Sequence, residues 1–186
     1  RYSYDPSGGS IYVSSNVGQV DINGELRARG ATLASSDETY FHGQGGYVSV
    51  NGVLIDIRGL IDTSAGGDAT TMAYLGSMSI QGYRVTNQST GTLKSTGRPT
   101  EGGISVEGIS SVINLGNILS SPTGYRLSEG PTSEGLGGGY VNLGGGTVVN
   151  NGTINVKGAS FTAGAGSKGG NGGYVEVNCS SFSNAG

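Results

Sequence analysis

Acidic residues are the side chains in this sequence whose types and spacing come closest to a catalytic arrangement. Asp21 and Asp56 occupy equivalent positions in a repeated pattern, and Asp62 falls on the strand predicted to follow Asp56. Polysaccharide lyases and glycosidases use acids that cluster on one outer face. The equivalent positions further along the chain carry no Arg or Lys that would support such a site: they are Gln88, Ile113 and Val149. We therefore expect that the protein is not an enzyme.

Metal and nucleophile chemistry finds little support among the remaining residues. His42 is the only histidine and Cys179 the only cysteine, so a His-based metal site or a Ser-His-Asp triad lacks a second anchor. Calcium-binding glycine repeats need Asp at a regular interval, whereas Ala65-Gly66-Gly67-Asp68 occurs once. We expect no cofactor and no bound metal, with calcium as the alternative left open. Cys179 falls where other units have glycine and is expected to be a small buried residue.

Composition excludes several classes of partner. The chain has 186 residues, 38 of them Gly and 4 Pro, with a formal net charge of −3. No basic patch is present, so nucleic acid is not an expected partner. No apolar run approaches the roughly 20 residues of a membrane-spanning helix. Apolar residues alternate with polar ones, which favours many short strands over a disordered glycine-rich linker.

Glycines mark a unit that repeats along the whole chain. Each unit opens at the second glycine of a Gly-Gly pair or at its single equivalent: Gly9, Gly46, Gly76, Gly103, Gly139 and Gly173. Another glycine follows 13 or 15 residues later: Gly24, Gly59, Gly91, Gly116, Gly152 and Gly186. A constant distance inside the unit, with variable spacing between units, is typical of a solenoid rung followed by a loop.

Alternation with a period of two gives the register inside each unit. Three short strands supply apolar residues from three directions, which indicates an all-β parallel β-helix of about five and a half rungs, with variable loops leaving one corner. The residues predicted to face inward are Ile11, Val13, Val20, Ile22, Leu26, Val48, Val50, Ile55, Ile57, Ile61, Met78, Ile80, Leu93, Ile104, Val106, Val112, Ile118, Val141, Leu143, Val148, Ile154, Val175, Val177 and Phe182. Residues 1–186 form a single domain, either complete or one segment of a longer solenoid.

One inward or corner position carries asparagine in three consecutive units. The residue two before the second glycine is Asn114, Asn150 and then Asn184, which predicts a stacked amide ladder between rungs. Earlier units have Ile22, Ile57 and Ser89 at this position. The alternative is that these are ordinary turn asparagines. We also expect a distorted rung over residues 82–96, where the second strand lacks the apolar pair of its neighbours.

Binding residues are expected on the loop edge and among outward aromatic side chains. Inserted loops on one face of a solenoid often bind a ligand, and the alternative is that these loops only cover the core. An outward tyrosine stripe is predicted at the residue after the first glycine. The candidate binding residues are Tyr40, Phe41, Tyr47, Tyr74, Tyr125, Arg126, Tyr140 and Tyr174.

Several predicted strands are bounded by glycines, such as Gly8-Gly9-Ser10-Ile11-Tyr12-Val13 and Gly172-Gly173-Tyr174-Val175-Glu176-Val177. They resemble the repeats of secreted bacterial β-helix surface proteins, in particular filamentous-haemagglutinin-like and autotransporter-type adhesins. The resemblance covers nearly the whole chain but is one of repeat style, and the loops here are longer than is common there. It implies a right-handed helix, an extracellular or cell-surface location, and a role in adhesion or surface architecture, with no catalytic residues to transfer.

Solenoid ends expose unpaired strands and apolar core, and they normally need caps. No capping helix is recognisable, so we expect self-association: subunits stacking head to tail, or contact with neighbouring β-helix segments, in a structural filament or surface assembly. The alternative function is that of an adhesin or carbohydrate-binding stalk with cell-surface glycans as ligands, and a polysaccharide lyase or glycosidase is a more distant one.

Overall fold

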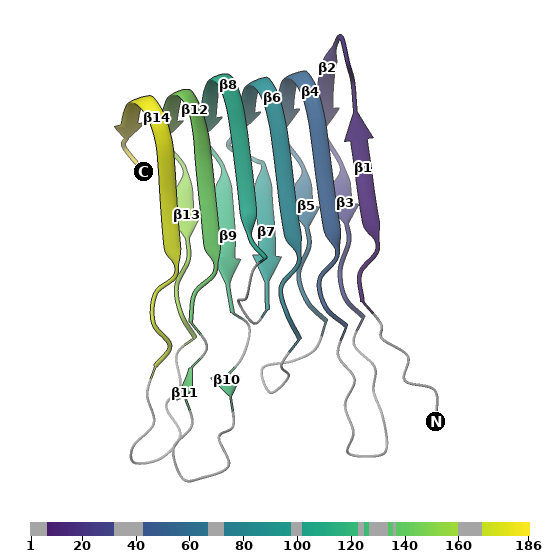
Figure 1. Ribbon diagram of the computed structural model, residues 1–186, viewed down its shortest axis with the longest axis vertical. Helices are drawn as coiled ribbons and strands as arrows, with labels where there is room; N and C mark the ends of the chain where they lie inside the picture. Colours follow the sequence, from purple (N-terminus) through teal and green to yellow (C-terminus); the bar gives the residue numbers. More distant parts are fainter. Residues whose placement is uncertain are drawn as a thin grey trace.

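The computed structural model of the chain describes residues 7–31, 43–66, 73–97, 102–122, 125–126, 134–135, 137–159 and 169–186 (Figure 1). All of its regular elements are strands, as predicted. They are β1 (Ser10–Ser14), β2 (Gln19–Ile22), β3 (Glu25–Arg27), β4 (Tyr47–Ile57), β5 (Leu60–Asp62), β6 (Ser77–Asn87), β7 (Thr92–Thr96), β8 (Ile104–Asn114), β9 (Asn117–Ser121), β10 (Tyr125–Arg126), β11 (Glu134–Gly135), β12 (Tyr140–Asn150), β13 (Thr153–Asn155) and β14 (Tyr174–Asn184).

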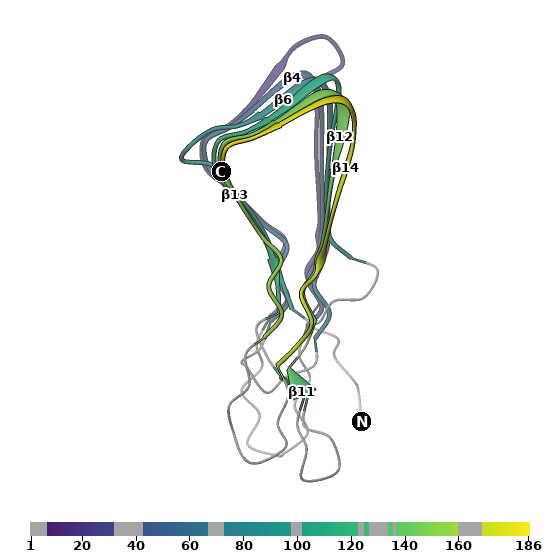
Figure 2. The same cartoon turned by 90° about the vertical axis from the view of Figure 1, so that its left-hand side faces the viewer.

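Two parallel sheets form a β-solenoid. The first has the order β1-β4-β6-β8-β12-β14, with β2 also paired to β4, and the second has the order β3-β5-β7-β9-β13. The chain ascends in the first sheet, crosses the top, descends in the second sheet and advances by one level, which makes a right-handed coil (Figures 1 and 2). The predicted right-handed parallel β-helix is therefore the fold. The strands β10 and β11 form a small antiparallel pair apart from it.

The first two strands predicted for each unit are one continuous strand. From β4 onward each strand of the first sheet runs for 11 residues and bends part-way, so that one strand supplies two of the three walls around the core (Figure 2). Four of these levels, those of β4, β6, β8 and β12, have a neighbouring strand on both sides. The solenoid thus has about four fully flanked turns, slightly fewer than the rung count predicted.

Apolar columns run through the stack as the alternation predicts. Val48, Ile57, Ile61 and Ile80 are fully buried, and the shifted register predicted for the fourth unit is confirmed because Ile104 pairs with Val141. The two end levels differ from the interior ones. At the first level Val20 and Ile22 are buried, whereas Ile11, Val13 and Leu26 are half-buried. Inward residues are partly exposed at the last level, where Val175 is 38% and Phe182 53% exposed. These residues have a level on one side only.

The Gly-Gly pairs lie where the two sheets meet and close the core. The amide of Gly46 donates to the carbonyl of Ala28 at 2.7 Å, and that of Gly76 donates to Thr63 at 2.9 Å. A Cβ on Gly45 would overlap the Thr63 carbonyl across the junction, and one on Gly46 would overlap the carbonyl of Gly9 in the level before. Backbones that approach this closely leave no room for a side chain, which explains why each repeat has glycine at these positions.

The distortion predicted for residues 82–96 is found elsewhere. The strand β6 stays in register with β4 throughout, and Val85 is buried in the column of Ile55. The extra residues of this unit form a turn over residues 88–90, closed by the Gly91 amide donating to Gln88 at 2.8 Å. The irregularity lies in β8, where the register against both neighbours shifts by one residue after Gly108.

Candidate functional site

The asparagine ladder is present and has one more member than predicted. Asn87 donates to the Oδ1 of Asn114 at 2.7 Å, Asn114 donates to Asn150 at 2.6 Å, and Asn150 donates to Asn184 at 2.7 Å. Asn87, and not Ser89, continues the column, because the longer turn before Gly91 displaces the count by two residues. These are not merely turn asparagines, since each amide bridges two levels.

The ladder has a direction. Every amide donates toward the C-terminal level, so Asn87 at its start has an Oδ1 that is buried and accepts no hydrogen bond from the described residues. The level before it carries Ile57 in the same column, which cannot donate. The hydrogen bonds of the ladder connect each level to the next, and we assign the ladder a structural role.

The acidic pair predicted at the outer face is stacked and shares one arginine. Asp21 and Asp56 are paired in register, and Arg58 forms an ion pair with each of them. Gln88 donates to Asp56 at 2.6 Å, although Thr86 takes the column position expected for Gln88. The equivalent positions of later levels carry no cation, as the sequence indicated, but Arg58 supplies one from the same level, two residues after Asp56. Two carboxylates held by one guanidinium form a structural ion-pair cluster.

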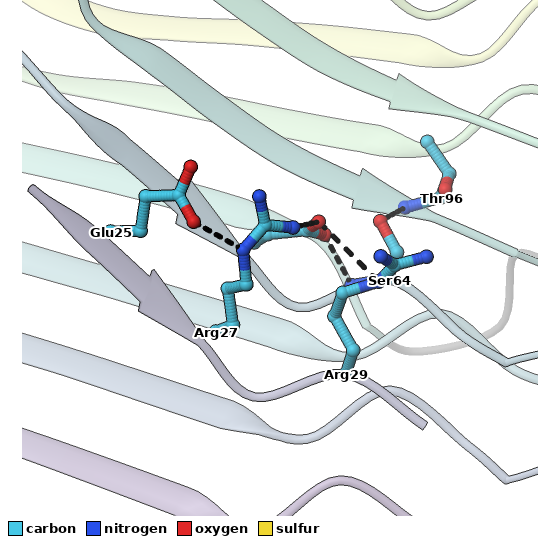
Figure 3. A network of polar contacts seen from close by, with 6 residues as sticks. Glu25, Arg27, Arg29, Ser64 and Thr96 are labelled. Atoms are coloured by element: carbon cyan, nitrogen blue, oxygen red, sulfur yellow. Dashed lines mark hydrogen bonds and ion pairs between the residues drawn. The ribbon is translucent and has the colours of Figure 1, made fainter. Parts of the chain in front are cut away.

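Asp62 is the one buried carboxylate in the described chain, and sequence reasoning left its environment open. Its side chain is 1% exposed and lies 3.5 Å from both Arg27 and Arg29 of the preceding level (Figure 3). The Ser64 amide donates to its Oδ1 at 3.0 Å, while the Ser64 hydroxyl accepts from the amide of Thr96 at 3.1 Å. A buried charge is tolerated where it is paired and hydrogen-bonded.

Arg27 joins this carboxylate to a second one at the surface. Its Nε lies 2.6 Å from Glu25 and its Nη1 3.5 Å from Asp62. The hydrogen bond from Arg27 lowers the pKa of Glu25, and the same bond raises the pKa of Arg27. Three levels are thus linked through Glu25, Arg27, Asp62, Ser64 and Thr96 (Figure 3).

The predicted tyrosine stripe is interrupted. Tyr140 and Tyr174 lie on neighbouring strands with parallel rings, 5.8 Å between centroids, but Ser77 stands beside Tyr47 in the same column. The Tyr140 hydroxyl donates to Glu176 at 2.6 Å. This hydrogen bond raises the pKa of Tyr140 to about 12 and, together with one from Asn178, lowers the pKa of Glu176.

Two other predicted binding residues come together at the base of the first sheet. Tyr47 and Tyr74 both line a hollow of about 580 Å³ whose remaining wall is mostly glycine and serine. Tyr12 lies near Tyr47, with 5.7 Å between ring centroids. Tyr40 and Phe41 lie outside the described residues, as does His42, and the side chains of Tyr125 and Arg126 are likewise not described.

A second hollow was missed by sequence reasoning. A groove of about 440 Å³ crosses the outside of the bend in β4, β6 and β8, and its lining includes Asn51, Val53, Gln81, Tyr83, Glu107 and Ile109. The signal in the sequence was a large apolar residue after the bend glycine, as in Gly52-Val53 and Gly82-Tyr83. A glycine followed by one large residue is also what an ordinary turn contains, so this pattern alone does not indicate a groove.

The described residues include no group of three or more His, Cys, Asp or Glu side chains placed to hold a metal ion. Asp68, the candidate calcium ligand, lies outside the described part of the chain. Cys179 is a free, half-buried thiol that packs against the core in the column of Gly145. In the described ranges no helix is long and apolar enough to cross a membrane.

Comparison with known proteins gives no relative: no family model matches the chain, and no similar protein of known function or similar solved structure was found.

Proposed function

We propose that this protein is a structural β-solenoid that associates end to end, level upon level, into a filament or surface assembly outside the cell. The observation that supports it is a pair of glycines at the first level. At the equivalent positions of the second level there is no room for a side chain. A Cβ on Gly46 or Gly59 would overlap a carbonyl of the preceding level. Gly9 and Gly24 occupy the same columns, yet a Cβ there would meet nothing within 4 Å.

Backbone conformation does not account for these two glycines either, since among the described residues only Gly97 has a φ in the left-handed range. A docked level on the open edge of β1 accounts for both. The carbonyl groups of the docked level would contact Gly9 and Gly24 in the same way as the carbonyls of Gly9 and Gly24 contact Gly46 and Gly59.

The two open edges match in register. Pairing through the stack places Val175, Val177 and Phe182 of β14 in the columns that hold Ile11, Val13 and Val20 at the other edge. The C-terminal edge opens into a hollow of about 440 Å³ lined by Val175, Val177 and Phe182. A second copy would cover these side chains and continue the apolar columns, at about 25 cal/mol for each Å² of apolar surface buried.

One column opposes this contact. Asn184 would meet Ile22 of the next copy, and an amide deprived of its acceptor costs about 1–3 kcal/mol. A neighbouring β-helix segment with an acceptor in that column avoids this cost and is the alternative partner. The extracellular setting comes from the resemblance of the repeats to secreted surface proteins.

The test is assembly of the purified chain across a concentration series, followed by sedimentation velocity and electron microscopy. We expect fibres or oligomers, and we expect Gly9→Ala combined with Gly24→Ala to block them while the midpoint of thermal unfolding stays unchanged. Tyr83→Ala, in the middle of the stack, is the control that should assemble normally. A chain that is monomeric at every concentration, or a double variant that assembles like the parent, contradicts the proposal.

A second candidate function is glycan binding by an adhesin or stalk. It is favoured by the hollow that Tyr47 and Tyr74 share, because half-buried aromatic rings beside hydroxyl groups suit a sugar. Glycan-array binding that is lost in Tyr47→Ala would support it, and an array with no positive glycan would exclude it.

A further inference from the structure

We infer that the groove across the bend of β4, β6 and β8 is a binding site for a neutral oligosaccharide. It lies over the bend at the middle of these strands, whereas Tyr47 stands at the beginning of β4. Figure 1 shows this bend at the top. The groove is therefore separate from the hollow at Tyr47. The residues that carry the inference lie on β4, β6 and β8, although Ser15 and Asn16 of the first level also line the groove.

Apolar side chains form one side of the groove and are exposed to water. Val53, Tyr83 and Ile109 follow the bend glycines of three successive levels and are 39%, 54% and 80% exposed. The strand β8 has one extra residue between Gly108 and Ser111, and the register shifts there. Ile109 is the first residue of this irregular segment. Large apolar groups gathered on an outer surface mark an interaction site more often than isolated ones do.

Hydrogen-bonding side chains form the other side. Asn51, Gln81 and Glu107 stand in one column of the three same levels. Gln81 donates to one oxygen of Glu107 at 3.3 Å, and Ser105 donates to the other at 3.4 Å. These contacts orient the carboxylate and leave each of its oxygens further lone pairs for a ligand.

The chemistry of the two sides selects the ligand. A ring face beside amide and carboxylate groups matches a pyranose, which has an apolar face and a rim of hydroxyl groups. The residues that line the groove include no Lys or Arg and one carboxylate, which disfavours sulfated, phosphorylated or otherwise anionic ligands. Successive strands are about 4.8 Å apart, close to the length of one pyranose residue, so consecutive sugars can meet equivalent side chains. The volume falls within the usual range for ligand sites.

The experiment is titration of the folded chain with neutral tetrasaccharides of glucose, mannose, galactose, xylose and N-acetylglucosamine, followed by calorimetry. We expect saturable binding of at least one of them. Tyr83→Ala should weaken it about tenfold, because the stacking ring is lost, and Glu107→Gln should weaken it several-fold with the shape of the groove retained. Both side chains are exposed, so circular dichroism should show an unchanged fold.

The matched control is Tyr12→Ala, which removes an exposed aromatic ring that lines neither hollow and should bind like the parent chain. Failure of all five tetrasaccharides to bind would overturn the inference. So would binding that survives Tyr83→Ala and Glu107→Gln, and binding lost in Tyr47→Ala alone would assign the sugar to the other hollow. Because Tyr83→Ala leaves both solenoid edges intact, loss of sugar binding and loss of assembly are separate results.

Discussion

Asn114 and Asn150 lie 36 residues apart in the sequence, and the amide of the first donates to the Oδ1 of the second at 2.6 Å. Both side chains are buried inside the solenoid. Each interior amide of the ladder acts as acceptor on one side and donor on the other, so that its polar groups are satisfied only by the levels above and below. This relationship ties stability to the stacking of levels.

Replacing a ladder asparagine should cost far more than replacing its neighbour. In Asn150→Ala the buried amide of Asn114 loses its acceptor, and an unsatisfied buried group costs about 1–3 kcal/mol. The control Asn151→Ala changes an exposed turn residue and should stay within about 0.5 kcal/mol. Urea unfolding measures both. Equal stabilities for the two variants would contradict a structural role for the ladder.

Replacing a turn glycine by alanine should destabilise the protein only where a preceding level packs against that glycine, and not at the equivalent turn of the first level. In Gly59→Ala the new Cβ overlaps the carbonyl of Gly24, so the levels must separate locally, at a cost of about 3 kcal/mol. In Gly24→Ala, at the equivalent turn, the Cβ meets nothing within 4 Å, and the stability of the monomer should change by less than about 0.5 kcal/mol. Thermal unfolding at low protein concentration compares them. A Gly24→Ala variant as unstable as Gly59→Ala would show that the turn itself requires glycine.

The fold could be predicted because its determinants are local and periodic. Glycine spacing and the alternation of residues such as Val48 and Val50 gave the sheets, the register and most of the core. Counting two residues back from Gly91 gives Ser89, whereas the ladder residue is Asn87. The turn before Gly91 is two residues longer than in later units, and an alignment of the units on this glycine does not reveal that.

The candidate sites were harder to predict, because they depend on contacts between levels. That Arg58 pairs with Asp21 across 37 positions follows from the side-chain geometry of β2 and of the turn after β4, which alternation does not give. The groove at Tyr83 depends on which way a strand bends, and the recurrence of a large apolar residue after the bend glycine does not reveal that direction.

Removing the charge of Asp62 should destabilise the second sheet. Asp62→Asn keeps an oxygen for the Ser64 amide but leaves Arg27 and Arg29 without their shared buried counter-ion, and we expect a loss of about 1–3 kcal/mol. Asp21→Asn, whose side chain is 41% exposed, should cost less than about 1 kcal/mol. The comparison is made by urea unfolding at neutral pH. If Asp62→Asn proves neutral, the buried ion pairs contribute nothing to stability.

The hydrogen bond from Tyr140 to Glu176 should be visible in the titration of both groups. Tyr140 has its pKa raised from 10.0 to about 12, so the stability from this bond is fully present below pH 10 and is lost as the pH rises through about 12. The pKa of Glu176 is lowered from its ordinary value of 4.5. Its contribution is therefore present above pH 4.5 and is lost as the pH falls through the lowered value.

Tyr140→Phe separates the two causes of the shift at Glu176. With the hydroxyl gone, the pKa of Glu176 should move up toward 4.5 but stay somewhat below it, because Asn178 still donates to the carboxylate at 3.0 Å. Carbon-13 NMR of labelled glutamate side chains measures this, and labelled tyrosines should lose the resonance that titrates near pH 12. Tyr174→Phe, which removes the hydroxyl of the stacked neighbour, is the control. An unchanged Glu176 titration in Tyr140→Phe would show that the bond does not persist in solution.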